Sequence, residues 1–271
     1  MFYKAKNGIV QLNDDVIDYV SFGSGNRNLI MIPGVGDGLK TVKGMALIFA
    51  IMYRKFAKDF KVYIFSRRRN IPKNYSIIEM ANDVAKSMEL LNIDNADVVG
   101  VSQGGMIAQH LAINYSEKVN KLVLAITSSR PNDLLEESVD TWVELLNKDD
   151  FVGMMRDNCQ RSYVGEYLKK MLKEYKVISL IAKPKSYDRF ITQALSCKIH
   201  NAYTDLNKIK NETLIIGAGL DGILGVNASY EIHDEIENSK LYIFKEYSHG
   251  VYEQTSDFYK VIYDFLKKNN L

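Results

Sequence analysis

Short apolar runs rich in β-branched residues alternate along the chain with segments in which apolar residues recur every three or four positions. After a hairpin expected around Ile9 to Phe22, such runs predict strands at 29–32, 62–65, 98–101, 122–126, 214–216 and 241–244. Most of these runs are apolar throughout, which indicates burial on both faces of a mainly parallel sheet. Stripes that begin at Ile77 and Phe258 predict amphipathic helices, the first capped near Ser76. The pattern therefore predicts an α/β fold: a mostly parallel central sheet with an N-terminal antiparallel hairpin and helices on both faces.

One interval breaks this alternation. About ninety residues separate the strand that ends at Ile126 from the one that begins at Leu214, too many for a simple crossover in a compact domain. The interval is helical in character and leaves from the edge of the sheet where open α/β sheets bind ligands. We therefore expect residues 129–206 to form a helical cap or lid, and residues 1–128 and 207–271 to form the core. Extra core packing is the alternative that the pattern leaves open.

A glycine-flanked serine lies where the predicted strand 98–101 passes into a helix. The run Gly100-Val101-Ser102-Gln103-Gly104 matches Gly-x-Ser-x-Gly, in which glycines allow a turn too tight for side chains. Such a turn exposes the serine oxygen above a helix N-terminus and suits a nucleophile. A serine that merely caps the helix is the alternative.

A nucleophilic serine needs a base, and the chain has four histidines. His110 lies in the helix that follows Ser102 and cannot turn back toward it, so a structural role is expected. His200 falls in the predicted cap and His233 on a predicted surface helix, where solvated or packed rings are expected. His249 differs, because its loop follows the strand 241–244 and reaches the same edge of the sheet as Ser102.

The acid that orients the base is expected between serine and histidine in the chain. Asp221 lies in GAGLDGILG, directly after the apolar strand TLIIG. Aspartate in a glycine-rich loop is also a common turn former. The order Ser102, Asp221, His249, each just after a separate strand, favours a catalytic triad over three coincidences.

An oxyanion formed by attack on a carbonyl needs two backbone N–H donors, each worth about 3 kcal/mol. The amides of Gln103, which follows the nucleophile, and of Val35, in the loop PGVGDG after the first parallel strand, are the expected donors. The loop lacks the P-loop lysine and the dinucleotide fingerprint, so nucleotide binding is not expected.

Composition adds few constraints. The 271 residues are 46% hydrophobic and 25% charged, with a net charge of +2, which fits one soluble domain and points to no particular partner. The arginine cluster 67–69 is interpreted as solvated surface or local ion pairing rather than a nucleic-acid site. The apolar run Gly44 to Tyr53 is too short to span a bilayer and is interpreted as a buried helix.

The two cysteines and the N-terminal segment indicate the compartment and the cofactors to expect. Cys159 and Cys197 have no metal-binding spacing and are expected to be unpaired thiols. The N-terminus does not resemble a signal peptide, so a cytoplasmic location is expected. No metal and no cofactor are expected.

Taken together, these segments resemble the α/β-hydrolase superfamily, in particular small, cap-bearing serine enzymes such as esterases, enol-lactone hydrolases and carbon–carbon bond hydrolases. The resemblance is carried by IPGVGDG, by the segment that contains GVSQGG, by GAGLDG and by YSHG. It implies a Ser102 nucleophile, an Asp221 acid and a His249 base, with oxyanion amides from Val35 and Gln103. The chain departs from the family at FSRRRN, where many relatives have Asp-x-Arg-Gly, so no substrate contact is transferred from that loop.

The expected function is hydrolysis of an ester-like bond in a small, largely apolar substrate through an acyl-serine intermediate. Acyl transfer, thioester cleavage and carbon–carbon bond hydrolysis use the same triad and remain alternatives. A non-catalytic ligand-binding protein on the same scaffold is a further alternative. The oligomeric state is not predicted.

Overall fold

Eight strands form a single sheet in the computed structural model, which describes residues 2–13 and 15–268. The strands are β1 (Lys6–Leu12), β2 (Asp15–Phe22), β3 (Arg27–Ile32), β4 (Phe60–Arg68), β5 (Ala96–Val101), β6 (Val119–Ala125), β7 (Glu212–Ala218) and β8 (Ser239–Phe244). Their order is β1-β2-β4-β3-β5-β6-β7-β8. The pairs β1/β2 and β2/β4 are antiparallel, and all later pairs are parallel. The predicted hairpin and mainly parallel sheet are confirmed.

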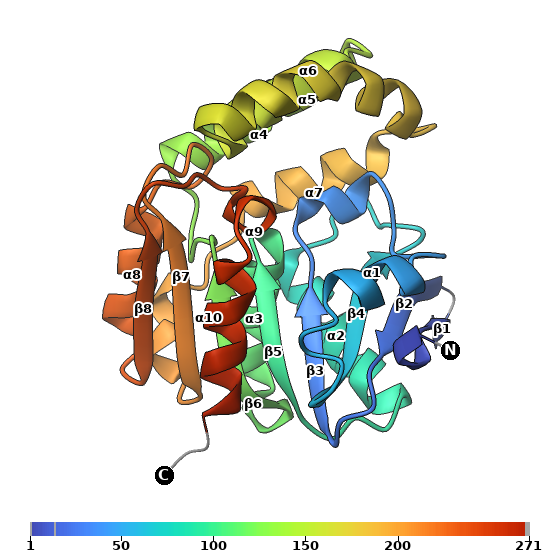
Figure 1. Cartoon of the computed structure of the whole chain (residues 1–271), viewed down its shortest axis with the longest axis vertical. Helices are drawn as coiled ribbons and strands as arrows, with labels where there is room; N and C mark the ends of the chain where they lie inside the picture. Colours follow the sequence, from blue (N-terminus) through green and yellow to red (C-terminus); the bar gives the residue numbers. More distant parts are fainter. Residues whose placement is uncertain (1, 14, 269–271) are drawn as a thin grey trace.

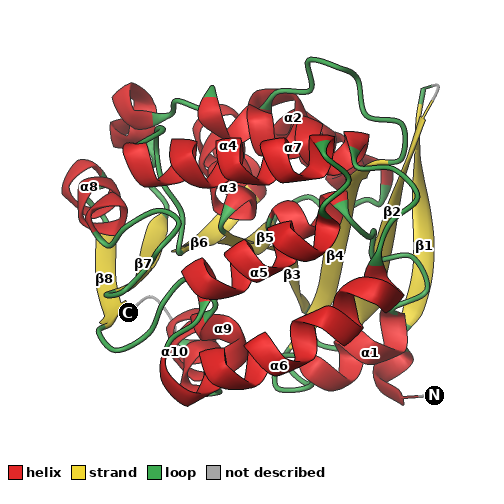
Figure 2. Cartoon of the chain, turned by 90° about the horizontal axis from the view of Figure 1, so that it is seen from above, coloured by secondary structure: helices red, strands yellow, loops and turns green. Residues whose placement is uncertain are grey.

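The strands are apolar throughout because both faces of the sheet are covered. In β3, Ile30 and Ile32 join one hydrophobic cluster, whereas Leu29 and Met31 join the cluster on the opposite face. The first cluster includes residues of α2 (Ile77–Leu90), α3 (Gln103–Asn114) and α8 (Asn227–Glu235). The second includes residues of α1 (Ala46–Met52) and α10 (Asp257–Lys267). Figure 2 shows the sheet between these two groups of helices.

The predicted insertion contains four helices between β6 and β7. They are α4 (Asp133–Asn147), α5 (Phe151–Ser162), α6 (Gly165–Ala182) and α7 (Asp188–Lys198). In Figure 1 these helices lie above the carboxyl ends of the strands. Buried residues of α4, α5 and α7 belong to the same hydrophobic cluster as α2 and α3. The division into core and cap stays a prediction, since the insertion extends the core as well as covering it.

Two elements differ from the sequence-based expectation. The apolar run around α1 does form a helix, but only its small residues Ala46 and Ala50 are buried, while Leu47, Ile48, Ile51 and Met52 are exposed. The interpretation as a buried helix is therefore wrong for one face of α1. The last strand, β8, alternates between partly buried and exposed positions because it lies at the edge of the sheet. Throughout residues 2–13 and 15–268, no helix combines the length and the apolar character needed to cross a membrane.

The start of α2 offers a matched test of this packing. Ser76 and Glu79 form a capping box there, Ile77 is 2% exposed, and the next residue, Ile78, is 47% exposed. We predict that Ile77→Ala lowers the free energy of unfolding by about 2–5 kcal/mol, because it leaves a cavity in the core. Ile78→Ala should change it by no more than about 0.5 kcal/mol. Urea unfolding of both variants measures the difference, and equal effects would contradict the placement of α2.

Candidate active site

Ser102 lies in a strained turn between β5 and α3. Its backbone has φ 54° and ψ −121°, a conformation that L-residues rarely adopt and that costs on the order of 1–3 kcal/mol. Two glycines make the turn possible. A Cβ on Gly100 would lie 2.3 Å from the carbonyl oxygen of Gly104, and a Cβ on Gly104 would lie 2.0 Å from that of Ile32. The Gly-x-Ser-x-Gly run therefore has the tight geometry that the sequence predicts.

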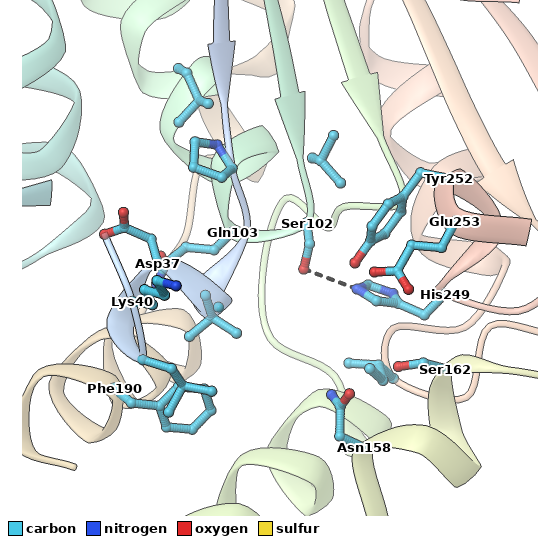
Figure 3. Close-up of a pocket in the computed structure, with 18 of the residues that line it drawn as sticks. Asp37, Lys40, Ser102, Gln103, Asn158, Ser162, Phe190, His249, Tyr252 and Glu253 are labelled. Atoms are coloured by element: carbon cyan, nitrogen blue, oxygen red, sulfur yellow. Dashed lines mark hydrogen bonds between the residues drawn. The ribbon is translucent and has the colours of Figure 1, made fainter. Parts of the chain in front are cut away.

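The structure brings Ser102, His249 and Asp221 into one hydrogen-bonded chain. His249 Nε2 lies 3.0 Å from Ser102 Oγ, and His249 Nδ1 lies 2.9 Å from Asp221 Oδ2. Figure 3 shows the hydrogen bond between the serine and the ring. These distances fall within the range for direct proton transfer. The three side chains have the relative placement of a nucleophile, a base and an orienting acid.

Asp221 is held as an anion in a buried position. Its Oδ1 accepts hydrogen bonds from the backbone N–H groups of Ile223 and Leu224, both at 2.9 Å. Burial by itself would raise the pKa of Asp221, but His249 and these two amides together lower it below its usual value. A carboxylate fixed in this way orients the imidazole and stabilises its protonated form.

The two expected oxyanion donors lie beside the serine. Gln103 begins α3, so its N–H has no acceptor within the helix. Val35 begins a short 3₁₀ turn, Val35–Gly38, and lines the same pocket as Ser102. The loop passes close to the nucleophile, because a Cβ on the preceding Gly34 would lie 3.4 Å from the Cβ of Ser102. The position of both amides fits an oxyanion hole, and their role stays a prediction.

The other three histidines lie outside this constellation. His110 and His200 are buried against each other, with ring centroids 5.1 Å apart. Burial lowers the pKa of His200 to about 3, so this ring is neutral at physiological pH. His233 on α8 is partly buried, and its Nδ1 lies 2.7 Å from Ser239 Oγ. None of them lines the pocket that contains Ser102.

The arginine cluster contains a support that sequence reasoning missed. Arg67 is buried rather than solvated, and its Nη2 donates to the carbonyl oxygen of Pro33 at 2.5 Å and to Gln103 Oε1 at 3.0 Å. It therefore bridges the two segments that carry the expected oxyanion amides. Gln103 Nε2 in turn donates to the carbonyl oxygen of Gln193 in α7, at 2.7 Å, which connects the insertion to the start of α3.

Local ion pairing is confirmed for the other two arginines of the cluster. Arg68 makes a bidentate pair with Asp83, with both contacts at 2.6 Å. Arg69 pairs with Asp18 at 2.6 Å and 3.1 Å. The sequence contains no signal that Arg67 is buried while Arg68 and Arg69 are not, because all three arginines stand in one run. The burial of Arg67 depends on its packing against α7 and the loop 33–38.

A pocket of about 550 Å³ opens above Ser102 and His249. Its wall is mostly apolar and combines core residues with residues of α4, α5 and α7, among them Leu135, Val139, Trp142, Met154 and Phe190. A few polar side chains interrupt this wall. Figure 3 shows Gln103, Asp37 and Lys40 on one side of Ser102, and His249, Tyr252 and Glu253 on the other. This volume and lining suit a small molecule with a large apolar part.

Metal ligands do not gather at this site. Among the residues described, no group of three or more His, Cys, Asp and Glu side chains could hold a metal ion. Cys159 and Cys197 are buried and unpaired, and burial raises the pKa of each thiol to about 11. Both thiols therefore stay protonated at neutral pH.

Comparison with known proteins shows the family to which this fold belongs. Residues 28–255 match the family model of the alpha/beta hydrolase fold. The chain belongs to the α/β-hydrolase family, and this places it among the hydrolases.

The relatives differ in what their names say they act on. The chain is 23% identical to RutD of Caulobacter sp. strain K31, which is named as a carbamate hydrolase, over 84% of this chain and 85% of that protein. It is 24% identical to the 2-hydroxy-6-oxo-2,4-heptadienoate hydrolase of Pseudomonas putida F1, over 90% of each. Among solved structures, MGS-M2, an α/β hydrolase from a deep-sea metagenome library of the Medee basin, superposes with a TM-score of 0.86. That pair is 20% identical, and the superposition covers 97% of this chain and 98% of that one.

A buried ion pair connects the loop 33–38 with the insertion. Asp37 has a side chain 1% exposed and pairs with Arg189 of α7 at 2.7 Å. We predict that Arg189→Met lowers the free energy of unfolding by about 3–5 kcal/mol, because it leaves the carboxylate buried without its partner. Lys86→Met, which breaks the exposed pair with Glu89, is the control and should cost no more than about 0.5 kcal/mol. Thermal or urea unfolding measures both, and a small effect of Arg189→Met would contradict the role of the pair.

Proposed function

We propose that this chain is a serine hydrolase that cleaves an ester-like bond of a small, largely apolar substrate through an acyl-serine intermediate. The single observation that carries the proposal is the chain of hydrogen bonds from Asp221 through His249 to Ser102, at the floor of an apolar pocket. A strained serine with an imidazole at hydrogen-bond distance is the arrangement that activates a hydroxyl for attack on a carbonyl.

The mechanism assigns one task to each group. Ser102 Oγ attacks the carbonyl carbon while His249 Nε2 takes its proton, and the N–H groups of Val35 and Gln103 stabilise the oxyanion. His249 then gives the proton to the leaving group, and the acyl-serine forms. A water molecule, deprotonated by the same imidazole, attacks the acyl-serine and releases the acid. Asp221 keeps the ring oriented and stabilises its charged state in both halves of the reaction.

The helical insertion completes the pocket in this proposal. Residues 129–206 act as a cap, since α4, α5 and α7 supply much of the apolar wall above Ser102. The cap thus selects the apolar part of the substrate, whereas the core supplies the reacting groups. Acyl transfer, thioester cleavage and carbon–carbon bond hydrolysis use the same groups and differ in the substrate that the cap admits. The unpaired cysteines favour a reducing, cytoplasmic location.

Turnover of p-nitrophenyl esters of graded acyl length tests the proposal and measures the depth of the pocket. The wild-type chain should hydrolyse short and medium esters, and the rate should fall once the acyl chain exceeds the pocket. Ser102→Ala should lower kcat by about 10⁴-fold or more, because the nucleophile is lost. Ser116→Ala, at an exposed serine remote from the pocket, is the control. Ester hydrolysis that survives in Ser102→Ala would refute the mechanism.

The orienting acid can be tested separately. Asp221→Asn keeps the shape and the acceptor oxygen but loses the charge, so the imidazole is held in the wrong tautomer. We predict a fall in kcat of about 10³- to 10⁴-fold with a folded protein. Asp94→Asn, at an exposed position, should leave kcat unchanged. Steady-state kinetics decide the matter, and an unimpaired Asp221→Asn enzyme would show that another group orients His249.

A further inference from the structure

Glu253 is a charged residue on the pocket wall that the proposed mechanism does not use. It lies on α9 (Val251–Gln254), four residues after His249, and lines the pocket on the His249 side of Ser102 (Figure 3). One of its oxygens, Oε2, accepts a hydrogen bond from the Tyr163 hydroxyl at 2.5 Å. Among the side chains that the structure describes, no lysine, arginine or histidine forms an ion pair with Glu253. The carboxylate therefore faces a mostly apolar pocket in which Lys40, the one described lysine or arginine on the wall, lies on the opposite side of Ser102 (Figure 3).

Tyrosine side chains share the pocket wall with this carboxylate. Tyr53, Tyr163, Tyr252 and Tyr259 line the same pocket. Burial raises the pKa of each phenol, and the negative charge of Glu253 raises it further, so each phenol stays neutral. Neutral tyrosines present electron-rich faces, which attract cations as a carboxylate does. The pocket wall thus combines a carboxylate with four neutral phenols, and both kinds of group attract a cation.

The energetic state of Glu253 follows from its surroundings. The protein atoms packed around Glu253 raise its pKa, and the hydrogen bond from Tyr163 offsets this only in part, although the side chain stays accessible to water within the open pocket. Because the side chain is exposed to water in the open pocket, a ligand that fills the pocket must displace this water, which is costly for an ionised carboxylate unless the ligand brings a cation or further hydrogen bonds. The other carboxylate on the pocket wall, Asp37, already has its compensation in Arg189. Glu253 is the pocket carboxylate whose charge a cationic ligand could neutralise.

We propose that the pocket binds ligands that carry a cationic nitrogen, with this group held between the Glu253 carboxylate and the tyrosine faces. If the proposed function holds, the substrate is an ester-like compound with an ammonium group at one end and the scissile bond beside Ser102. The inference rests on the proposed function only where it calls the ligand a substrate, because binding of the cationic group does not require catalysis.

A matched pair of phenols tests the charge preference. 4-(Trimethylammonio)phenol and 4-tert-butylphenol have nearly the same shape and differ by one positive charge. Isothermal calorimetry on the wild-type chain should show about tenfold tighter binding of the cationic phenol. Glu253→Gln should remove this preference, because it keeps the acceptor for Tyr163 and deletes only the charge. Glu246→Gln, at an exposed position three residues before His249, should keep the preference.

Each outcome is decisive. Equal affinity of the wild-type chain for the two phenols would overturn the proposal, and so would a preference that survives in Glu253→Gln. If Glu253→Gln also loses the neutral phenol and its cooperative unfolding, Glu253→Leu provides the second variant, which removes the charge without adding an amide. A charge preference without ester turnover would refute the proposed function alone, whereas ester turnover without a charge preference would refute this inference alone.

Discussion

The close approach of α3 to the carboxyl end of β3 is the constraint on which the site depends. At Gly104 the backbone of α3 leaves no room for a Cβ beside the carbonyl oxygen of Ile32. The chain enters this position from β5 only through a residue with positive φ, and that residue is Ser102. The strain is supported by the packed sheet on both sides, so the serine oxygen stays exposed at a fixed point.

Sheet order explains why the other two groups arrive at the same point. Ser102 follows β5, Asp221 follows β7 and His249 follows β8, and these parallel strands end at one edge of the sheet. Loops after such strands converge above that edge, which is why α/β sheets place ligands there. The insertion between β6 and β7 leaves from the same edge and lies above it (Figure 1), and its helices α4, α5 and α7 supply part of the pocket wall.

Much of this could be predicted from the sequence, because its signals are local. Apolar β-branched runs located the strands, and glycines located the elbow at Ser102. The order of Asp221 and His249 after later strands made them the partners to expect. These features depend on residues that are neighbours in the chain, so pattern reasoning reached them.

The remaining features depend on contacts between distant segments. Arg67 stands in a run of three arginines, and only the placement of Pro33 and Gln103 around it makes it a buried bridge. The exposure of one face of α1 depends on which residues the sheet covers. Glu253 reads as a polar residue on a short helix, and its position on the pocket wall depends on the insertion that brings Tyr163 to it. Tertiary packing decides the surroundings of each of these residues, and no local sequence pattern predicts those surroundings.

The central claim is that the elbow makes Ser102 a nucleophile, and labelling with a fluorophosphonate measures this most directly. Intact-protein and peptide mass spectrometry should find one adduct, on Ser102, and no adduct after Ser102→Ala or denaturation. A chain that stays unlabelled, or a label on another residue, would contradict the account.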